Sequence, residues 1–595
     1  MDRVSFFQNQ IEDFSNQSKI TEKSLQETSL LRILVFIFGS ILCYFTFDFS
    51  QLLSVSIGIV ALVLFLWLVK KHQNTAYQLS FQRANIRINE DELNRQKLVF
   101  VRQETGLNFS NLTHFYTNDF DIFGSHSLFK LLNRAYTQNG MKLLAHWLST
   151  GADAIEISVR QVAVKELSDL FDWRQDFQAT AQIESKISEP TDFLLEWVNT
   201  SDNQNINKLK YFRFLPIITL LVWFFIFIDI VPIGFGIVLL LAHFYISGQV
   251  HKATKDFSQQ SDNIVDTLKT FSKLLEKIEN QDFKSDKIKQ LQSKLNSDSK
   301  ASVAIKSFSR IVENLNFRLN VYFWILIGMP TLWDLHWFIQ LEKWKQTHKN
   351  NLKSWLDVLS EVEALNSLAG FSFANPDYIF PESSHEKVEI KATKIAHPLL
   401  KKEKRIANDF SMNGVGETVL ITGSNMSGKS TFLRTLGINL VLANIGSVVC
   451  ASSFKTSTLL LFTSMRTQDS LAENTSSFYA ELKRLKTLLT ITEKNNIPVL
   501  YFLDEILKGT NSDDRHKGAK ALIEQLHTQN TSGFVSTHDL ELGEMADRYD
   551  FVHNYSFKSY FEDDVLKFDY KLEKGICQEA NAAALMRQIG IKIKE

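Results

Sequence analysis

The sequence has few of the residues that define disulfide-bonded or zinc-stapled domains. Only three cysteines occur in 595 residues, Cys43, Cys450 and Cys577, and they lie far apart without CxxC spacing. This pattern argues against a disulfide framework and against a cysteine-rich zinc site, and it suits a reducing compartment. Prolines (8) and glycines (23) are also scarce for this length, which favours long helices over a sandwich of short strands and turns.

The chain also lacks an excess of charge of either sign. Lys and Arg number 65 and Asp and Glu 66, giving a net charge of −1 at pH 7. No global basic field directs the protein toward nucleic acid, so any such contact must depend on a local patch. The length exceeds what one ordinary hydrophobic core accommodates, and we therefore expect several domains.

Two apolar stretches predict helical hairpins that cross a membrane. The first lies within residues 1–72 and has uncharged runs at 33–47 and 52–69; the second occupies 206–250. A bilayer core of ~30 Å needs ~20 helical residues, which the runs and their flanks approach. Lys and Arg flank both hairpins but are missing from both tips, so we expect both to enter and leave on the cytoplasmic side. The alternative is that these stretches are core helices of a large soluble domain.

The regions between and after the hairpins predict long polar-faced helices. Residues 73–205 and 251–385 show a helical period, and apolar residues recur at spacings of three, four and seven between 257 and 275, as on packed helix faces. A further apolar stretch at 321–333 is only 13 residues long and contains a proline. We predict that it does not span the membrane, because another crossing would place the C-terminal region outside the cell.

A phosphate-binding loop follows a predicted strand in the last third of the chain. An apolar run, Thr418 to Ile421, precedes the pattern Gly-x4-Gly-Lys-Ser, and helix-forming residues follow it. Glycines let successive backbone N–H groups turn toward phosphates, and the helix N-terminus adds its positive dipole end. Lys429 is expected to reach the β and γ phosphates of ATP, and the Ser430 hydroxyl to bind Mg²⁺. The predicted nucleotide-binding residues are Gly423, Ser424, Asn425, Met426, Ser427, Gly428, Lys429, Ser430 and Thr431.

Two later strands predict the rest of the catalytic machinery. The buried-type run at 498–505, PVLYFLDE, ends in two acids. Asp504 is placed to bind Mg²⁺ together with Ser430, and Glu505 to act as the general base that orients the attacking water. A third strand at 533–536 ends beside His538, which is placed to sense the γ phosphate. The predicted catalytic residues are therefore Glu505, Lys429 and His538.

These motifs resemble the MutS family more specifically than they resemble a generic P-loop. TGSNMSGKST at 422–431 is similar to the family's TGPNMGGKST, and DSLAENTSSFYAEL at 469–482 to its DDLASGxSTFMxEM. LDEILKGTNSDD at 503–514 and STHDLEL at 536–542 are similar to MDExGRGTST and ATHxxEL, and His397-Pro398 matches a family His-Pro. A weaker likeness to the family's helical lever domain begins near residue 110 and includes Thr137 and Gly140 in a Thr-x-x-Gly pattern.

The resemblance implies an ABC-like α/β P-loop ATPase domain at 386–595, preceded by α-helical membrane and lever regions. It implies ATP and Mg²⁺ as cofactors and a homodimer in which Ser476 and Asn474 of one subunit complete the γ-phosphate site of the other; Asn474 stands where the family usually has glycine. The similar segment at 575–590 implies dimer packing. No mismatch-reading domain with a Phe-x-Glu wedge is recognised, so mismatch recognition does not carry over.

Three functional hypotheses follow. The first is a membrane-anchored MutS-like ATPase, multi-pass in the cytoplasmic (inner) membrane with its ATPase domain in the cytoplasm, whose dimer closure moves helical levers around DNA. The second is an ABC-like ATPase that acts on a membrane or protein partner without DNA. The third, a nucleotide-gated scaffold with negligible turnover, is disfavoured because Lys429, Ser430, Asp504 and Glu505 are all present.

Overall fold

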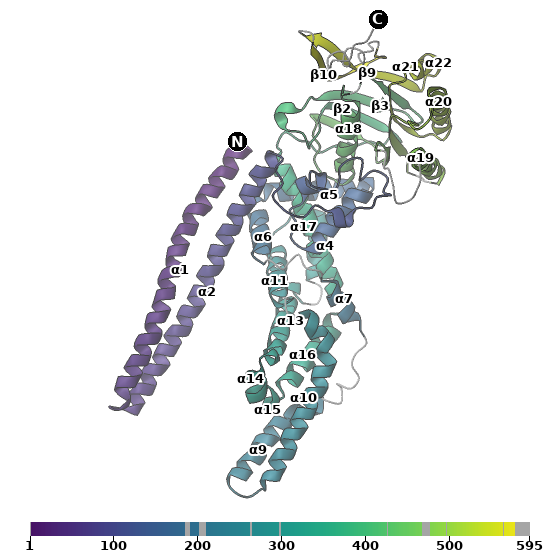
Figure 1. Cartoon of the computed structure of the whole chain (residues 1–595). Helices are drawn as coiled ribbons and strands as arrows, with labels where there is room; N and C mark the ends of the chain where they lie inside the picture. The colour runs from purple at the N-terminus through teal and green to yellow at the C-terminus, as the bar shows by residue number, and fades with distance from the viewer. Residues whose placement is uncertain are drawn as a thin grey trace. The chain divides into compact units, whose positions relative to one another are not determined.

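The computed structural model describes residues 2–184, 191–200, 210–261, 264–296, 299–424, 426–466, 477–494, 497–562 and 565–577. The chain divides into two compact units (Figure 1). The helical unit comprises residues 1–90, 135–141 and 171–363, and the sheet unit comprises residues 91–134, 142–170 and 364–595.

Helices make up most of the described chain. In order they are α1 (Arg3–Phe47), α2 (Gln51–Gln96), α3 (Leu128–Leu132), α4 (Gln138–Thr150), α5 (Ala154–Asp169), α6 (Phe171–Ile183), α7 (Asp192–Asn199), α9 (Leu215–Phe227), α10 (Ile233–Ser261), α11 (Ile264–Asn280), α12 (Asp286–Leu295), α13 (Ala301–Asn316), α14 (Val321–Phe323), α15 (Met329–Thr331), α16 (Trp333–His348), α17 (Leu352–Ala374), α18 (Lys429–Asn444), α19 (Ser477–Lys494), α20 (Ser512–Thr528), α21 (Leu540–Gly543) and α22 (Met545–Arg548). A π-helical turn, η4 (Trp324–Gly328), joins α14 to α15.

The strands all lie in the sheet unit. They are β1 (Glu382–Ser383), β2 (Glu389–Ile395), β3 (Asn408–Asn413), β4 (Thr418–Thr422), β5 (Ser453–Thr456), β6 (Leu460–Ser464), β7 (Val499–Asp504), β8 (Ser532–Thr537), β9 (Val552–Glu562) and β10 (Val565–Lys574).

The first predicted hairpin forms as two long antiparallel helices, α1 and α2, which lie side by side (Figure 1). Near the tip the helices approach closely: the Ser54 hydroxyl donates to the Cys43 carbonyl over 2.8 Å. Farther along, a Cβ on Gly39 would lie 2.7 Å from the Ala61 methyl. Small residues at such positions let two helix backbones pack together without a large apolar interface.

Four helices of the described chain are long and apolar enough to cross a membrane, by length and composition: Arg3–Phe47, Gln51–Gln96, Lys210–Phe227 and Ile233–Lys252. Their apolar windows are only 0%, 11%, 6% and 28% buried within the protein. Most side chains of these windows therefore lie on the outside of the described protein. The segment Val321–Thr331 is a shorter apolar helix, as its length and proline predict.

The remainder of the helical unit packs around α11, α13 and α16. The apolar stripe predicted at 257–275 continues into α11, where Leu268, Phe271 and Leu275 are buried. Phe308 of α13 stacks on Trp344 of α16 with ring centroids 4.2 Å apart. The helical period in this region therefore corresponds to a packed core, as expected.

The Thr-x-x-Gly pattern has a local structural reason. The Glu363 carboxylate accepts the backbone N–H groups of Tyr136 and Thr137 over 2.9 and 3.1 Å, and the Thr137 hydroxyl also contacts it. A Cβ at Gly140 would collide with the same carboxylate. Thr137 and Gly140 thus make room for an acid that caps the start of α4.

A six-stranded sheet of order β10-β9-β4-β8-β7-β6 forms the centre of the sheet unit. Strands β9, β4, β8, β7 and β6 are parallel, and β10 is antiparallel to β9. Every residue of β4 is buried, as expected of a strand covered on both faces. A second sheet, of order β1-β5-β2-β3, lies in the same unit. The three strands predicted around the P-loop correspond to β4, β7 and β8.

The sheet unit extends beyond the predicted range 386–595, since residues 91–134 and 142–170 belong to it as well. Phe120 explains much of this association: its ring lies edge-on to Phe502 of β7 at 5.3 Å and covers Gly437 of α18 so closely that no Cβ would fit there. A side chain larger than glycine at 437 would displace the ring.

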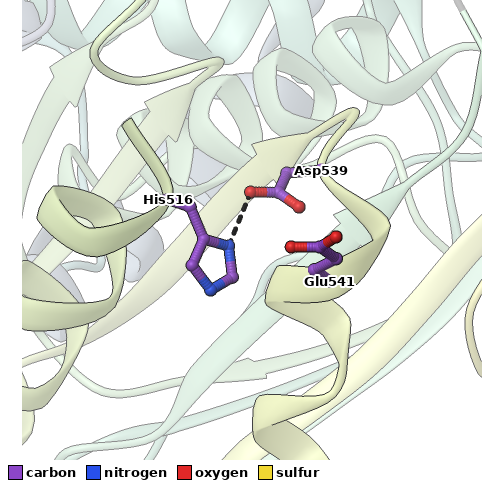
Figure 2. Close-up of side chains that lie close together, drawn as sticks. All are labelled: His516, Asp539 and Glu541. Atoms are coloured by element: carbon purple, nitrogen blue, oxygen red, sulfur yellow. Dashed lines mark hydrogen bonds and ion pairs between the residues drawn. The ribbon is translucent and has the colours of Figure 1, made fainter. Parts of the chain in front are cut away.

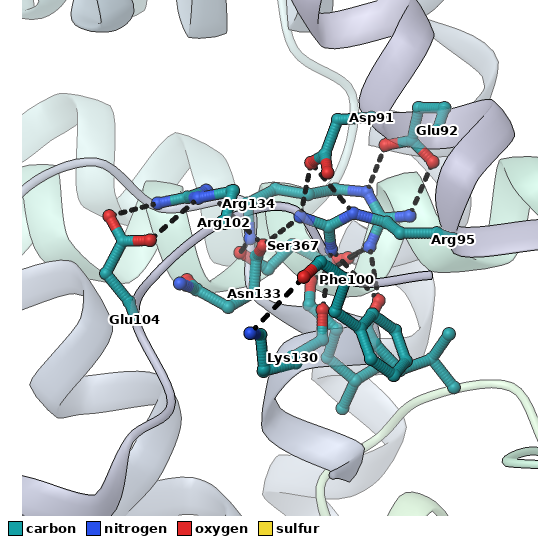
Figure 3. Close-up of polar contacts among 12 residues, drawn as sticks. Asp91, Glu92, Arg95, Phe100, Arg102, Glu104, Lys130, Asn133, Arg134 and Ser367 are labelled. Carbon is teal, nitrogen blue, oxygen red and sulfur yellow. Dashed lines mark hydrogen bonds and ion pairs between the residues drawn. The ribbon is translucent and has the colours of Figure 1, made fainter. Parts of the chain in front are cut away.

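Buried arginines fasten the end of α2 within this unit (Figure 3). Arg134 forms a bidentate pair with Glu92, at 2.6 and 2.7 Å, and its backbone N–H donates to the Ser367 hydroxyl of α17. Arg95 bonds Asp91 and the carbonyl oxygens of Lys130, Leu131 and Asn133. The guanidinium groups thereby satisfy carbonyls at the C-terminus of α3.

Candidate nucleotide-binding site

The predicted P-loop lies between the C-terminal end of β4 and the N-terminus of α18. Gly423 (φ 150°) and Gly428 (φ 112°) adopt backbone conformations that L side chains rarely take, which explains two of the motif's glycines. A Cβ at Gly423 would come within 2.8 Å of the Ser427 hydroxyl. Met426, with φ 68°, is exposed at the loop's outer side. The predicted Asn425 lies outside the described residues.

Lys429 points back into this loop. Its ammonium donates to the carbonyl oxygens of Gly423 at 2.7 Å and Ser424 at 3.1 Å, and the residue is only 4% exposed. Burial lowers the pKa of Lys429, while the negative charges of Glu505 and Asp504 act to raise it. The side chain therefore holds a cationic donor inside the loop, where the phosphates of a nucleotide would lie.

Ser430 and Asp504, the two predicted magnesium ligands, lie within hydrogen-bond distance of each other. The Ser430 hydroxyl donates to Asp504 Oδ2 over 2.6 Å. The second carboxylate oxygen accepts from the hydroxyl of Ser536, the penultimate residue of β8, a contact that the sequence did not indicate. Three elements, α18, β7 and β8, thus converge on one carboxylate.

Glu505 follows directly on the end of β7. Its carboxylate bonds His538 Nε2 at 2.6 Å and Lys508 Nζ at 3.0 Å. The hydrogen bond from His538 and the nearby Lys508 charge lower the pKa of Glu505 to about 2, against the opposing effect of burial. The group is therefore ionised at neutral pH and is suited to accept a hydrogen bond from water. His538 also lies 3.5 Å from Lys429 Nζ, so the three predicted catalytic residues form one contiguous chain.

The loop that carries Glu505 turns sharply. Glu505 (φ 53°) and Leu507 (φ 59°) are both left-handed non-glycine residues, a conformation that persists only where the surroundings hold it. Glu481 of α19 accepts the Leu507 backbone N–H, and a Cβ on Gly509 would lie 2.5 Å from that of Phe478. Helix α19 is thus fitted against the segment that positions Glu505, a role for Glu481 that its place in the motif alone did not reveal.

His516, Asp539 and Glu541 lie together beside the strand-to-helix turn after β8 (Figure 2). Their ligand atoms are within 4.8 Å of one another, a group that could hold a divalent cation. His516 Nδ1 lies 2.8 Å from Asp539 Oδ2, and Asp539 caps α21 by accepting the Leu542 N–H. Because His516 and Asp539 already bond each other and Asp539 also caps α21, we interpret the pair as structural: it holds Asp539, the residue after His538, in place.

The described residues fit ATP and Mg²⁺. The hydroxyls of Ser424 and Ser427 are buried and have no hydrogen-bond partner among the described residues, and phosphate oxygens would supply one. Ser430 and Asp504 are oxygen ligands of the kind that Mg²⁺ prefers. A cavity of about 150 Å³ opens beside Asp504 and Glu505 and is also bordered by Glu481, Arg484 and Lys508, so water can reach Glu505 from this side.

Part of the predicted site lies outside the described residues. Ser476 and Asn474, which the resemblance assigns to the partner's γ-phosphate site, fall in the segment 467–476, and most of the predicted closing segment 575–590 also falls outside. The other predicted site residues form the P-loop or lie beside it. The loop and the start of α18 contain Gly423 through Thr431, apart from the undescribed Asn425. Asp504, Glu505 and His538 lie beside them.

Comparison with known proteins agrees with this geometry. Residues 419–592 match the family model of MutS domain V. The C-terminal region is MutS-like. The "DNA mismatch repair protein MutS" of Thermotoga maritima is 30% identical over 247 residues, covering 41% of this chain and 30% of that protein. "MutS protein homolog 4" of Homo sapiens is 33% identical over 233 residues, covering 37% and 24%.

The similarity is confined to part of each protein. "DNA mismatch repair protein MutS 2" of Halobacterium salinarum is 29% identical over 237 residues, covering 39% of this chain and 27% of that protein. The chain thus spans about a third or less of the length of these relatives. The matches support a relationship to the MutS family at the level of the domain that contains the P-loop.

Proposed function

We propose that this chain is a membrane-anchored, MutS-like ATPase that couples ATP binding and hydrolysis to closure of a dimer of its ATPase domains. The observation that carries the proposal is the 2.6 Å hydrogen bond between Ser430 and Asp504, the residue immediately before Glu505. It joins the P-loop to the strand end that holds the general base, which is the arrangement that phosphoryl transfer to water requires.

In this mechanism the P-loop amides and Lys429 bind the phosphates, and the Lys429 charge offsets the negative charge that develops on them. When bound, Mg²⁺ would be held by Ser430 and Asp504 and would supply charge neutralisation. Glu505 orients the attacking water through its carboxylate. Because its pKa is about 2, the carboxylate is a weak proton acceptor, and its main contribution is to position the water.

His538 couples the position of Lys429 to the hydrogen bonding of Glu505. It contacts the carboxylate at 2.6 Å and the Lys429 ammonium at 3.5 Å. Movement of Lys429 toward a γ phosphate would change both contacts, and with them the hydrogen bonding of Glu505, as the nucleotide binds. Ser476 and Asn474 of a second subunit would complete the phosphate site from the other side.

The membrane part of the proposal rests on the four candidate spans. An even number of crossings would return the chain to its starting side, and we infer that this side is the cytoplasm, where ATP is available to the ATPase domain. The basic residues that flank both hairpins support the same orientation.

DNA is the partner that the names of the similar proteins suggest, and a DNA-bound, mismatch-repair-like role is part of the proposal. The second candidate is an ABC-like ATPase that moves a membrane or protein partner. The net charge of −1 and the apolar hairpins favour this second candidate.

The test is ATP hydrolysis by the detergent-solubilised full chain, alone and with duplex, mismatched, branched and single-stranded DNA at two salt concentrations. We expect Lys429→Ala to abolish ATP binding and Glu505→Gln to bind ATP with little turnover. Glu544→Gln, an exposed acid of the same unit, is the matched control and should hydrolyse like the parent. Parent-like turnover of Glu505→Gln would refute the role assigned to Glu505.

The DNA arms separate the two candidates. Stimulation by one DNA form, weaker at higher salt, supports the DNA-bound role, because phosphate contacts release counterions. Hydrolysis that no DNA form changes supports the membrane or protein partner.

A further inference from the structure

The segment Val321–Thr331 has an exposed hydrophobic face. Its outward side chains are Val321, Tyr322, Ile325, Leu326 and Ile327, which are 46% to 80% exposed. No charged residue occurs between Arg318 and Asp334. An exposed hydrophobic face of this extent indicates contact with another protein or with lipid.

The inner face of the segment is fixed to the second hairpin by a buried histidine. His243 of α10 is 0% exposed; its Nδ1 lies 3.0 Å from the Met329 carbonyl of α15, and its Nε2 lies 2.9 Å from the Thr219 hydroxyl of α9. Because a carbonyl only accepts, Nδ1 donates to Met329. The partner of Nε2 is the Thr219 hydroxyl, which also donates to the Leu215 carbonyl over 2.9 Å. One ring thus joins both hairpin helices to the apolar segment.

This contact sets the depth of the segment relative to the hairpin. His243 is the eleventh residue of the 20-residue candidate span Ile233–Lys252, and Thr219 is the tenth of the 18-residue span Lys210–Phe227. At ~1.5 Å per residue both lie about 12–15 Å from the span ends, close to the middle of a ~30 Å bilayer core. Met329 shares that depth, since its carbonyl bonds the same ring. The Phe244 and Trp324 rings, 6.2 Å apart, continue the contact.

The ends of the segment show that it turns back rather than crosses. Leu332, in the left-handed conformation (φ 48°), reverses the chain and is itself buried, so the one non-helical residue is shielded by protein as a bilayer requires. Asp334 follows; it is 1% exposed and accepts the Trp324 indole N–H. The acid is therefore held inside the protein and does not face lipid.

We propose that Val321–Thr331 is a re-entrant membrane element, which enters the bilayer beside the second hairpin and leaves on the same side, with lipid acyl chains covering its outer face. The inference rests on the proposed membrane anchoring. Leu241 and Tyr245 of α10, the helix that contacts the segment through His243, are also exposed, so lipid that covers this helix would lie next to the segment. Because the segment does not cross, the ATPase domain stays on the cytoplasmic side.

The experiment uses single-cysteine full-length protein, with Cys43, Cys450 and Cys577 replaced by serine, labelled with a bimane fluorophore and reconstituted in phosphatidylcholine vesicles. Labels are placed at Leu326 on the segment, Leu220 on α9 and Val303 on α13, which are 75%, 72% and 60% exposed. Because all three side chains already face outward, the substitutions leave the packing intact. Quenching by doxyl lipids and by aqueous iodide is measured at each position.

We expect doxyl lipids to quench the labels at 326 and 220 several-fold more strongly than the label at 303, and iodide to give the opposite order. Lipid quenching at 220 with iodide quenching at 326 overturns the re-entrant element and leaves the anchoring intact. Iodide quenching at both positions removes the anchoring proposal and the inference with it. Protection at 326 from both quenchers shows a protein cover, such as a second copy of the chain, and also overturns the inference.

Discussion

Replacing Glu92 by glutamine tests whether the buried arginine network holds the end of α2. The variant keeps the size of the side chain and one acceptor oxygen, but it removes the charge opposite Arg134. The two side chains are only 6% and 3% exposed. Arg134 would keep hydrogen bonds to neutral carbonyls such as that of Leu132, with its guanidinium charge buried and uncompensated.

The expected loss of folding free energy depends on how deeply the ion pair is buried, not on the distance between its charged groups. Breaking a buried ion pair by removing one partner costs ~3–5 kcal/mol, because the remaining charge stays desolvated. The chain supplies its own control: Arg83 of α2 and Glu22 of α1 are 2.9 Å apart but 49% and 48% exposed. An exposed pair of this kind contributes ~0–1 kcal/mol, so Glu22→Gln should change little.

Amide hydrogen exchange of the peptides that cover 91–104 and 128–134 measures local opening in the detergent-solubilised protein. A loss of ~3 kcal/mol corresponds to roughly 100-fold faster exchange in Glu92→Gln. The double replacement Glu92→Met with Arg134→Met should recover much of the protection, since it leaves no unpaired charge. Equal, small effects of Glu92→Gln and Glu22→Gln would contradict the argument that burial sets the magnitude.

Three further outcomes are expected. Glu481→Ala should lower kcat for ATP hydrolysis with little change in ATP Kd, while Glu481→Gln, which still accepts the Leu507 N–H, should retain most activity; equal losses in both would refute a positioning role. Burial lowers the pKa of His397 from 6.5 to about 4, so the folded state binds fewer protons than the unfolded state between these pH values and stability rises with pH across the window. Denaturant titrations should show the parent losing roughly 3 kcal/mol from pH 7 to pH 4 through this group, a loss that His397→Gln lacks. Gly437→Ala, although helix-favouring by ~1 kcal/mol, should lower the melting temperature, because the Phe120 ring occupies the position of the new methyl group.

The features that the sequence predicted well are those fixed by short-range rules. Gly423 and Gly428 take positive φ values that glycine accommodates best, and Asp504 and Glu505 stand where a buried strand ends. The helical stripe at 257–275 likewise follows from periodicity alone. Such patterns can be read without knowing what lies opposite them.

Contacts between distant segments could not be predicted in this way. Glu481 meets Leu507, 26 residues later, only because the loop turns twice through left-handed conformations. Phe120 joins the sheet unit through Phe502 and Gly437, far away in the sequence. Nothing in the local pattern around residue 120 indicates these partners, so the sequence did not predict that residues 91–134 pack in the same compact unit as the P-loop.

The contacts of Glu505 imply an order of events at the site. One carboxylate oxygen faces His538 and the other faces Lys508, so a water that binds Glu505 shares its acceptor oxygen with one of these two groups. Lys429 is the group that a nucleotide would draw away from its carbonyl partners, and it neighbours His538. Nucleotide binding would therefore reach the general base through Lys429 and His538 before water is positioned. Under the proposed function, this order separates ATP binding from hydrolysis, because water is positioned only after the contacts of Lys429 and His538 have changed.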